Sequence, residues 1–108
     1  MKTISIANDF TKYPGGRYRK HGNGSGEEFR NRYLVPALQN NEPLTIILDG
    51  TVGYSSSFLE EAFGGLVRSG FGKELVHKLI SIKASGPFLA YESLIWRYVD
   101  SSPSKNLG

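Results

Sequence analysis

The chain has 108 residues, no cysteine and a formal net charge of +3. A chain of this length buries one modest core, so we expect a single domain over residues 1–100 with a polar tail at 101–108. The lack of cysteine excludes disulfides, a thiol nucleophile and cysteine-bound metals. No apolar run approaches the roughly 20 residues of a membrane span, and no signal-like region follows Met1, so we expect a cytoplasmic protein without membrane contact.

The first quarter of the chain predicts a strand, an arm and a loop. Thr3–Ala7 alternates polar and apolar residues, which is typical of a half-buried strand. Residues 10–18 carry three aromatic side chains around a Pro-Gly-Gly turn, which indicates an irregular hairpin or extended arm. Residues 20–26 are rich in glycine and predict a loop. Ser25 and Glu28 then match a capping box, in which the serine caps a helix.

The remainder alternates strand and helix signals. Leu44–Leu48 is a nearly continuous run of β-formers and predicts a central strand covered on both faces. A second capping box predicts a helix with Ser57 as its N-cap, in which Gly64-Gly65 indicates close backbone packing. Residues 73–77 fit either a short helical turn or the start of a strand. Residues 79–83 predict a strand, and the last helix follows it, so the order favours an α/β layer fold with a partly parallel sheet.

A basic segment precedes the first helix and offers one candidate site. Lys12, Arg17, Arg19 and Lys20 lie close together with no acid among them. Glycines at 22, 24 and 26 then lead into a helix, where free amides and the helix dipole favour an anion. The anion-binding candidates are Arg17, Arg19, Lys20, Gly24 and Ser25, and the ligand would be a nucleotide, a nucleic acid or a phosphorylated partner. The structural alternative is a flexible loop followed by an N-cap.

Three consecutive serines offer the other candidate site. Ser55, Ser56 and Ser57 lie where a central strand ends and a helix begins, which is where sites tend to lie in open α/β sheets. One serine suffices to cap the helix. A phosphate on another serine would be stabilised by the helix N-terminus and would change the exposed surface without unfolding the domain.

Metal and hydrolase chemistry find little support. His21 and His77 are far apart in the chain and have no cluster of acids at ligand spacing. No G-x-S-x-G elbow is present, and no pattern sets a base beside a nucleophile. We therefore expect no cofactor, no metal site and no catalytic residue.

The combined pattern resembles a known family, the prokaryotic STAS-like domains of unknown function, which diverge from the STAS domain of anti-sigma factor antagonists. The resemblance extends from about Ile4 to Trp96. The residues that carry it are Gly16-Arg17, Gly22, Ser25-Gly26-Glu27, Phe29-Arg30, Leu48-Asp49-Gly50 and Ser55-Ser56-Ser57-Phe58.

The resemblance implies a mixed β-sheet of about four strands with three main helices packed largely on one face. It also implies a regulatory protein-interaction domain that acts in signalling and transcription regulation without catalysis. Its partner would be a histidine-kinase-like ATPase or an anti-sigma-type factor, with phosphorylation as a switch. By position, the phosphoacceptor would be Ser56 or Ser57. The partner-binding residues would be Asp49, Tyr54, Ser55, Phe58 and Glu61.

Overall fold

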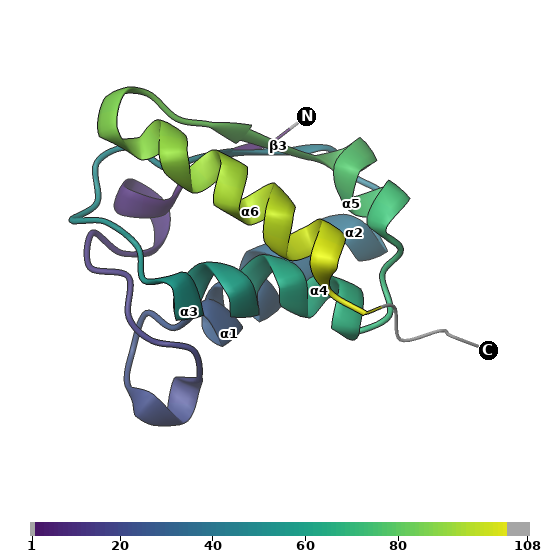
Figure 1. Ribbon diagram of the computed structural model, residues 1–108, viewed down its shortest axis with the longest axis horizontal. Coiled ribbons are helices and arrows are strands. Elements are labelled where there is room, and N and C mark those ends of the chain that lie inside the picture. Colours follow the sequence, from purple (N-terminus) through teal and green to yellow (C-terminus); the bar gives the residue numbers. More distant parts are fainter. Residues whose placement is uncertain (1, 104–108) are drawn as a thin grey trace.

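The computed structural model describes residues 2–103 of the chain and has an α/β fold built on a parallel sheet (Figure 1). The strands are β1 (Lys2–Ser5), β2 (Leu44–Ile47) and β3 (Ile80–Lys83), in the order β1-β2-β3. Both pairings are parallel, and they place Ile4 beside Ile46 and Ile46 beside Ile82.

The predicted α/β class is confirmed, but the mixed sheet of about four strands is not found in residues 2–103, where three strands are all parallel. The chain turns directly after β1 into η1 (Ile6–Phe10), because the Ser5 hydroxyl accepts a hydrogen bond from the Asn8 amide. The following arm does not join the sheet either. Its Gly15 amide donates instead to the Gly24 carbonyl, at 2.7 Å, inside the glycine-rich loop.

The first long helical segment comprises α1 (Gly26–Phe29), the π-helical η3 (Arg30–Leu34) and α2 (Val35–Gln39). Its predicted cap is confirmed, because the Ser25 hydroxyl accepts a hydrogen bond from the Glu28 amide at 3.0 Å. Before this helix, the loop contains one short 3-10 turn, η2 (Arg19–His21).

The second long segment comprises α3 (Ser56–Leu59), the π-helical η4 (Glu60–Gly64) and α4 (Gly65–Arg68). It crosses the first segment at very close range. A Cβ on Gly26 would lie 2.4 Å from the Phe58 carbonyl oxygen, and one on Gly65 would lie 2.4 Å from Nη1 of Arg30. The predicted close packing of Gly64-Gly65 is thus confirmed.

Two further helices flank β3. Residues 73–77 belong to a helix, α5 (Lys73–Leu79), which is additional to the three main helices predicted. After β3, η5 (Gly86–Phe88) leads into α6 (Leu89–Ser101). Ser102 is buried, and residues 104–108 of the predicted tail lie outside the described range.

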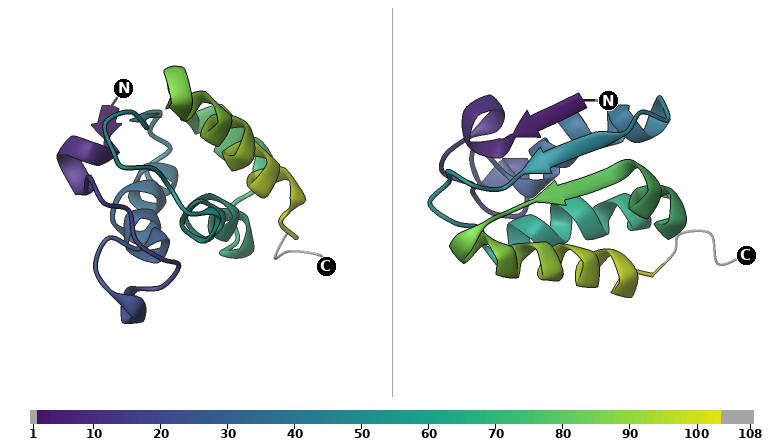
Figure 2. Two further views of the ribbon diagram at one scale, coloured as in Figure 1. Left: turned by 60° about the vertical axis from the view of Figure 1, so that its left-hand side comes forward. Right: turned by 90° about the horizontal axis from the view of Figure 1, so that it is seen from above.

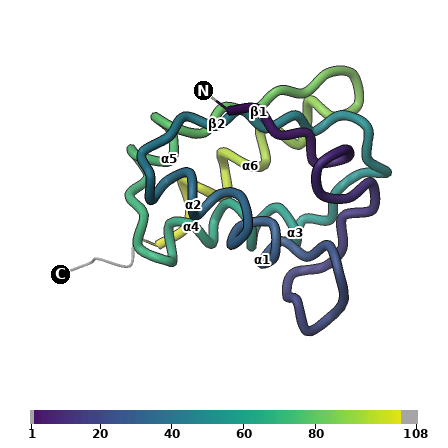
Figure 3. The backbone as a smooth tube through the Cα atoms, turned by 180° about the vertical axis from the view of Figure 1, so that it is seen from behind, coloured from purple at the N-terminus to yellow at the C-terminus, as the bar shows by residue number. Residues whose placement is uncertain are grey.

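The helices lie on one side of the sheet, as the edge-on view in Figure 1 and the view from above in Figure 2 show. This arrangement follows from the strand alternation: Ile4, Ile46 and Ile80 are buried against the helices, while Thr3 and Ser81 are exposed on the other face. The central position of β2 is confirmed, but its predicted coverage on both faces is wrong. Figure 3 shows from behind that the loops after β1 and β2 gather at one end of the sheet.

Candidate functional site

The second long helix begins at the serine cluster, at the end of the sheet where β2 stops. Ser55 is the N-cap: its hydroxyl accepts a hydrogen bond from the Phe58 amide at 3.0 Å. The prediction that Ser57 is the cap is therefore wrong, because the helix starts two residues earlier than the capping-box spacing indicated. The Ser55 hydroxyl also donates to the Gly15 carbonyl at 3.3 Å, which ties the arm to the helix start.

Ser56 and Ser57 are the first two residues of this helix. Ser56 is exposed and Ser57 is partly exposed. Within residues 2–103, neither hydroxyl forms a hydrogen bond. The cap is thus supplied by Ser55, while the Ser56 hydroxyl is accessible from solvent at the positive end of the helix dipole.

The loop that leads into the serine cluster is held from inside by an aromatic residue. Tyr54 is 8% exposed, and its hydroxyl donates to the Leu48 carbonyl at 2.7 Å. Burial raises the pKa of Tyr54 to about 12, so the phenol is neutral across the physiological range. Its ring packs against Phe58 and Tyr91. Because Tyr54 and Phe58 are buried, these two predicted partner-binding residues support the loop and do not present a surface.

The arm runs beside this loop and adds nonpolar side chains to the surface. The Val52 amide donates to the Lys12 carbonyl at 2.9 Å, and Ser55 contacts Gly15 three residues further along both segments. Val52 is 72% exposed and Tyr13 is 70% exposed. We use the name entrance surface for Tyr13, Val52, Ser55 and Ser56, a combination that the sequence patterns did not predict.

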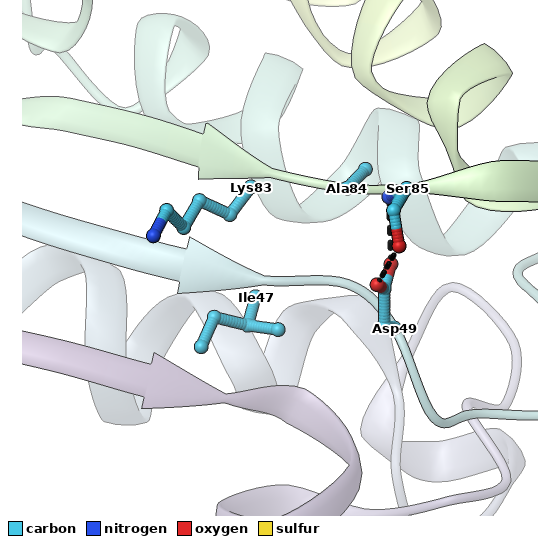
Figure 4. Close-up of a pocket in the computed structure, with 5 residues that line it drawn as sticks. All are labelled: Ile47, Asp49, Lys83, Ala84 and Ser85. Carbon is cyan, nitrogen blue, oxygen red and sulfur yellow. Dashed lines mark hydrogen bonds between the residues drawn. The ribbon is translucent and has the colours of Figure 1, made fainter.

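Asp49 crosslinks the loops that follow β2 and β3. Its carboxylate accepts hydrogen bonds from the Ser85 amide, at 3.0 Å, and from the Ser85 hydroxyl. These two hydrogen bonds hold the pKa of Asp49 below its usual value. The pair borders a hollow of about 250 Å³ at the uncovered face of the sheet, which Ile47, Lys83 and Ala84 complete (Figure 4). Asp49 therefore positions loops at the same end of the sheet as Ser55 without touching the serine cluster.

Glu61, the last predicted partner-binding residue, belongs to a network of ion pairs. One of its carboxylate oxygens lies 2.5 Å from Arg30 and the other lies 3.1 Å from Arg17. Glu60 lies 2.5 Å from Arg17 and also pairs with Arg68. Burial would raise the pKa of Glu60, but hydrogen bonds from Arg68 and Arg17 outweigh it and leave the pKa below its usual value.

This network joins the arm, both long helices and the end of α6. Arg68 also donates to the hydroxyl of the buried Ser102 at 3.3 Å. No sequence pattern assigned Arg68, Arg30 or Glu60 to a network of ion pairs. The glycine pair at 64–65 was the available signal, because Arg30 occupies the space that a side chain on Gly65 would fill. Arg17, predicted as an anion ligand, is already paired with the two glutamates.

The glycine-rich loop uses its amides internally. The Gly24 amide donates to Glu28, the Gly26 amide to the Gly16 carbonyl and the Glu27 amide to the Arg17 carbonyl. Gly24 and Ser25 are both buried. The predicted anion cradle at Gly24 and Ser25 is therefore closed by the arm, and Arg19 and Lys20 are the predicted anion ligands that stay exposed.

Two kinds of feature are absent from residues 2–103. No group of three or more His, Asp or Glu side chains is arranged to hold a metal ion. No helix in this range combines the length and the apolar character needed to cross a bilayer.

The parallel sheet and the capped helix start after β2 together define a small α/β domain. A family model described as a STAS-like domain of unknown function matches residues 25–87, and the chain belongs to this family. The match covers the first capping box, β2, the serine cluster and β3. No curated protein and no solved structure matches the chain.

Proposed function

We propose that this protein is a non-enzymatic regulatory domain that binds a protein partner through the entrance surface. The observation that carries the proposal is an exposed serine hydroxyl at a helix start beside two exposed nonpolar side chains, Val52 and Tyr13. Buried nonpolar contact with a polar surround is the usual composition of a protein interface. The side chains of Tyr54 and Phe58 fix the loop from below, so the surface is presented by a rigid support.

Phosphorylation of Ser56 would switch this contact. A phosphate adds a charge of about −2 and three acceptor oxygens. At the first turn of a helix it is stabilised by the dipole, and Ser55 keeps its capping bond. Ser57 is the second candidate because it is less exposed. The proposed partner is a histidine-kinase-like ATPase or an anti-sigma-type factor, the class that the family resemblance implies. The proposed role is cytoplasmic signalling that controls transcription.

The phosphorylation step is tested with purified protein, magnesium, ATP and a histidine-kinase-like ATPase from the same genome. Phosphopeptide mapping should place the label on Ser56, and Ser56→Ala should abolish it. Ser101→Ala is the matched control, because Ser101 is an exposed serine at the far end of α6. Absence of label on residues 55–57 with every such ATPase would remove the switch and leave binding alone.

The binding step is tested separately with the same partner and no ATP. Val52→Asp and Tyr13→Asp should each weaken binding at least about tenfold, since burying an unpaired charge in an interface costs well over 1 kcal/mol. Leu89→Asp is the control, because Leu89 is 54% exposed on α6. Equal losses in all three variants would show that the entrance surface is not the contact.

A further inference from the structure

A second surface, independent of the entrance surface, lies at the end of the glycine-rich loop. Figures 1 and 3 show that the segment containing η2 projects away from the body of the domain. It consists of Tyr18, Arg19, Lys20, His21 and Gly22, which we name the basic tip. All five residues are exposed. Three basic residues, Arg19, Lys20 and His21, thus follow one another on this projecting segment.

The cations of the basic tip are available for a ligand. Within residues 2–103, neither Arg19 nor Lys20 forms an ion pair, whereas Arg17 is held by both Glu60 and Glu61. The two arginines of the arm therefore have different roles. Arg17 anchors the arm to the second long helix, and Arg19 lies beyond the anchor with its guanidinium unpaired.

Two hollows meet at Arg19 and continue the basic surface onto the first long helix. One has a volume of about 370 Å³ and is lined by Tyr18, Arg19, Lys20 and Glu27. The other, of about 210 Å³, is lined by Arg19, Glu28, Asn31 and Arg32. The Arg32 side chain is 59% exposed and lies 4.0 Å from Glu28. Three cationic side chains thus line one continuous track.

An aromatic ring lies within this track. Tyr18 is 38% exposed, and Nζ of Lys20 lies 5.7 Å from its ring centroid. Glu27 accepts a hydrogen bond from the Arg19 amide through one carboxylate oxygen, at 2.9 Å, and its other oxygen is not used in this bond. Cations, an aromatic face and a hydrogen-bond acceptor together match the phosphate, the base and the amino or hydroxyl groups of a nucleotide.

We propose that the basic tip binds single-stranded nucleic acid, with phosphates on Arg19, Lys20 and Arg32 and a base stacked on Tyr18. Single strands expose the base faces that an aromatic side chain stacks on, which a duplex hides. The tip holds no aliphatic side chain that could insert into a bilayer, so a lipid surface fits it less well. An acidic peptide would use the cations but would leave the Tyr18 face without a role.

The test measures anisotropy of a fluorescent oligodeoxythymidylate of about a dozen nucleotides in low salt, with the full chain. The logarithm of the association constant should fall linearly with the logarithm of the salt concentration. The slope should be about −2, since each of three neutralised phosphates of a single strand contributes about −0.7. An Arg19→Ala/Lys20→Ala variant should bind at least about tenfold more weakly and have a shallower slope.

Two variants of Tyr18 test the stacking directly. Tyr18→Ala should lose about tenfold in affinity, while Tyr18→Phe should retain it, since base stacking needs the ring and not the hydroxyl. Lys78→Ala/Arg97→Ala is the matched charge control, because both residues are exposed cations on α5 and α6. Circular dichroism of each variant should be unchanged, since the altered side chains are exposed.

Three results would overturn the proposal. One is no binding at low salt. Another is equal loss of affinity in the Lys78/Arg97 control and in the Arg19/Lys20 variant, which would indicate attraction by net charge alone. The third is binding of a polyglutamate peptide or of phosphatidylglycerol vesicles as tight as that of the oligonucleotide and equally dependent on Tyr18, which would assign the tip to that other partner. Phosphorylation of Ser56 has no part in any of these outcomes.

Discussion

Both long helices of this protein begin with a serine that caps them, but only one begins at the surface. Ser25 and Ser55 each accept a hydrogen bond, at 3.0 Å, from the amide three residues later. Ser25 is fully buried, and the arm covers the amides of Gly26 and Glu27 with its own carbonyls. Ser55 is exposed and is followed by Ser56, whose hydroxyl has no hydrogen-bond partner in the part of the chain that the structure describes.

The difference shows that a capping serine marks where a helix begins but does not determine whether that start is accessible. Accessibility was decided by the arm, residues 11–24, which folds over the first helix start and only borders the second. The same arm contributes Tyr13 to the entrance surface and carries the basic tip. One helix start thus anchors the arm, and the other stays exposed to solvent.

The largest expected effect is at the buried helix start. Gly26→Ala adds a Cβ that would lie only 2.4 Å from the Phe58 carbonyl oxygen, so the two long helices must separate. We expect a loss of about 3 kcal/mol in the free energy of unfolding, measured by urea denaturation. Gly16→Ala is the control, because a Cβ there meets nothing within 4 Å. A loss below about 1 kcal/mol would show that the helices can shift apart cheaply.

Removing the buried capping serine should cost more stability than removing the exposed one. Ser25→Ala should cost about 2 kcal/mol and Ser55→Ala about 1 kcal/mol, since water can replace the lost acceptor at the exposed start but not at the buried one. The midpoints of thermal unfolding, compared at equal protein concentration, provide the measurement. Equal costs would mean that water reaches the Glu28 amide, which contradicts the burial of the first start.

A smaller effect concerns Glu60, which anchors the arm through Arg17. The folded-state pKa of Glu60 lies below its unfolded value of about 4.5. The contribution of its carboxylate to the free energy of unfolding is therefore fully present above that pH. The contribution is lost as the pH falls below 4.5 through the lower folded-state pKa. Because the Glu60 side chain keeps 24% of its surface in contact with solvent, which screens the ion pairs, we expect less than about 1 kcal/mol.

Glu60→Gln tests this contribution and its consequence for the arm. The variant should lose stability at pH 7 and show a weaker acid dependence than the wild type between pH 5 and about 3. Hydrogen exchange of the Gly26 and Glu27 amides should accelerate as the arm loosens. Glu74→Gln is the control, because Glu74 is exposed on α5. An unchanged acid dependence would show that the ion pairs with Glu60 do not stabilise the fold.

Local sequence patterns predicted several strands and helix starts of this fold. They could not predict the ion pairs between residues far apart in the chain. The strand at Leu44–Leu48 and the cap at Ser25 follow from alternation and capping chemistry, which depend on neighbours in sequence. The pairing of Arg17 with Glu60 joins residues 43 positions apart, and no periodicity encodes it. The shift of the second cap from Ser57 to Ser55 has a local cause: each of the three consecutive serines can act as an N-cap, although only Ser57 is followed three residues later by a glutamate. In the structure it is the Ser55 hydroxyl that accepts a hydrogen bond from the Phe58 amide.

The smallest expected effect on stability, and the most decisive for function, is at Ser56. Ser56→Ala should change the free energy of unfolding by less than about 0.5 kcal/mol, because the side chain is exposed and Ser55 already supplies the cap. The same substitution should abolish phosphorylation by the partner ATPase. Ser55→Ala should give the opposite result: it weakens the helix start yet leaves the acceptor hydroxyl in place. If instead Ser55→Ala removed the label and Ser56→Ala did not, the capping serine would be the modified residue, and the open helix start would have to fray before it is phosphorylated.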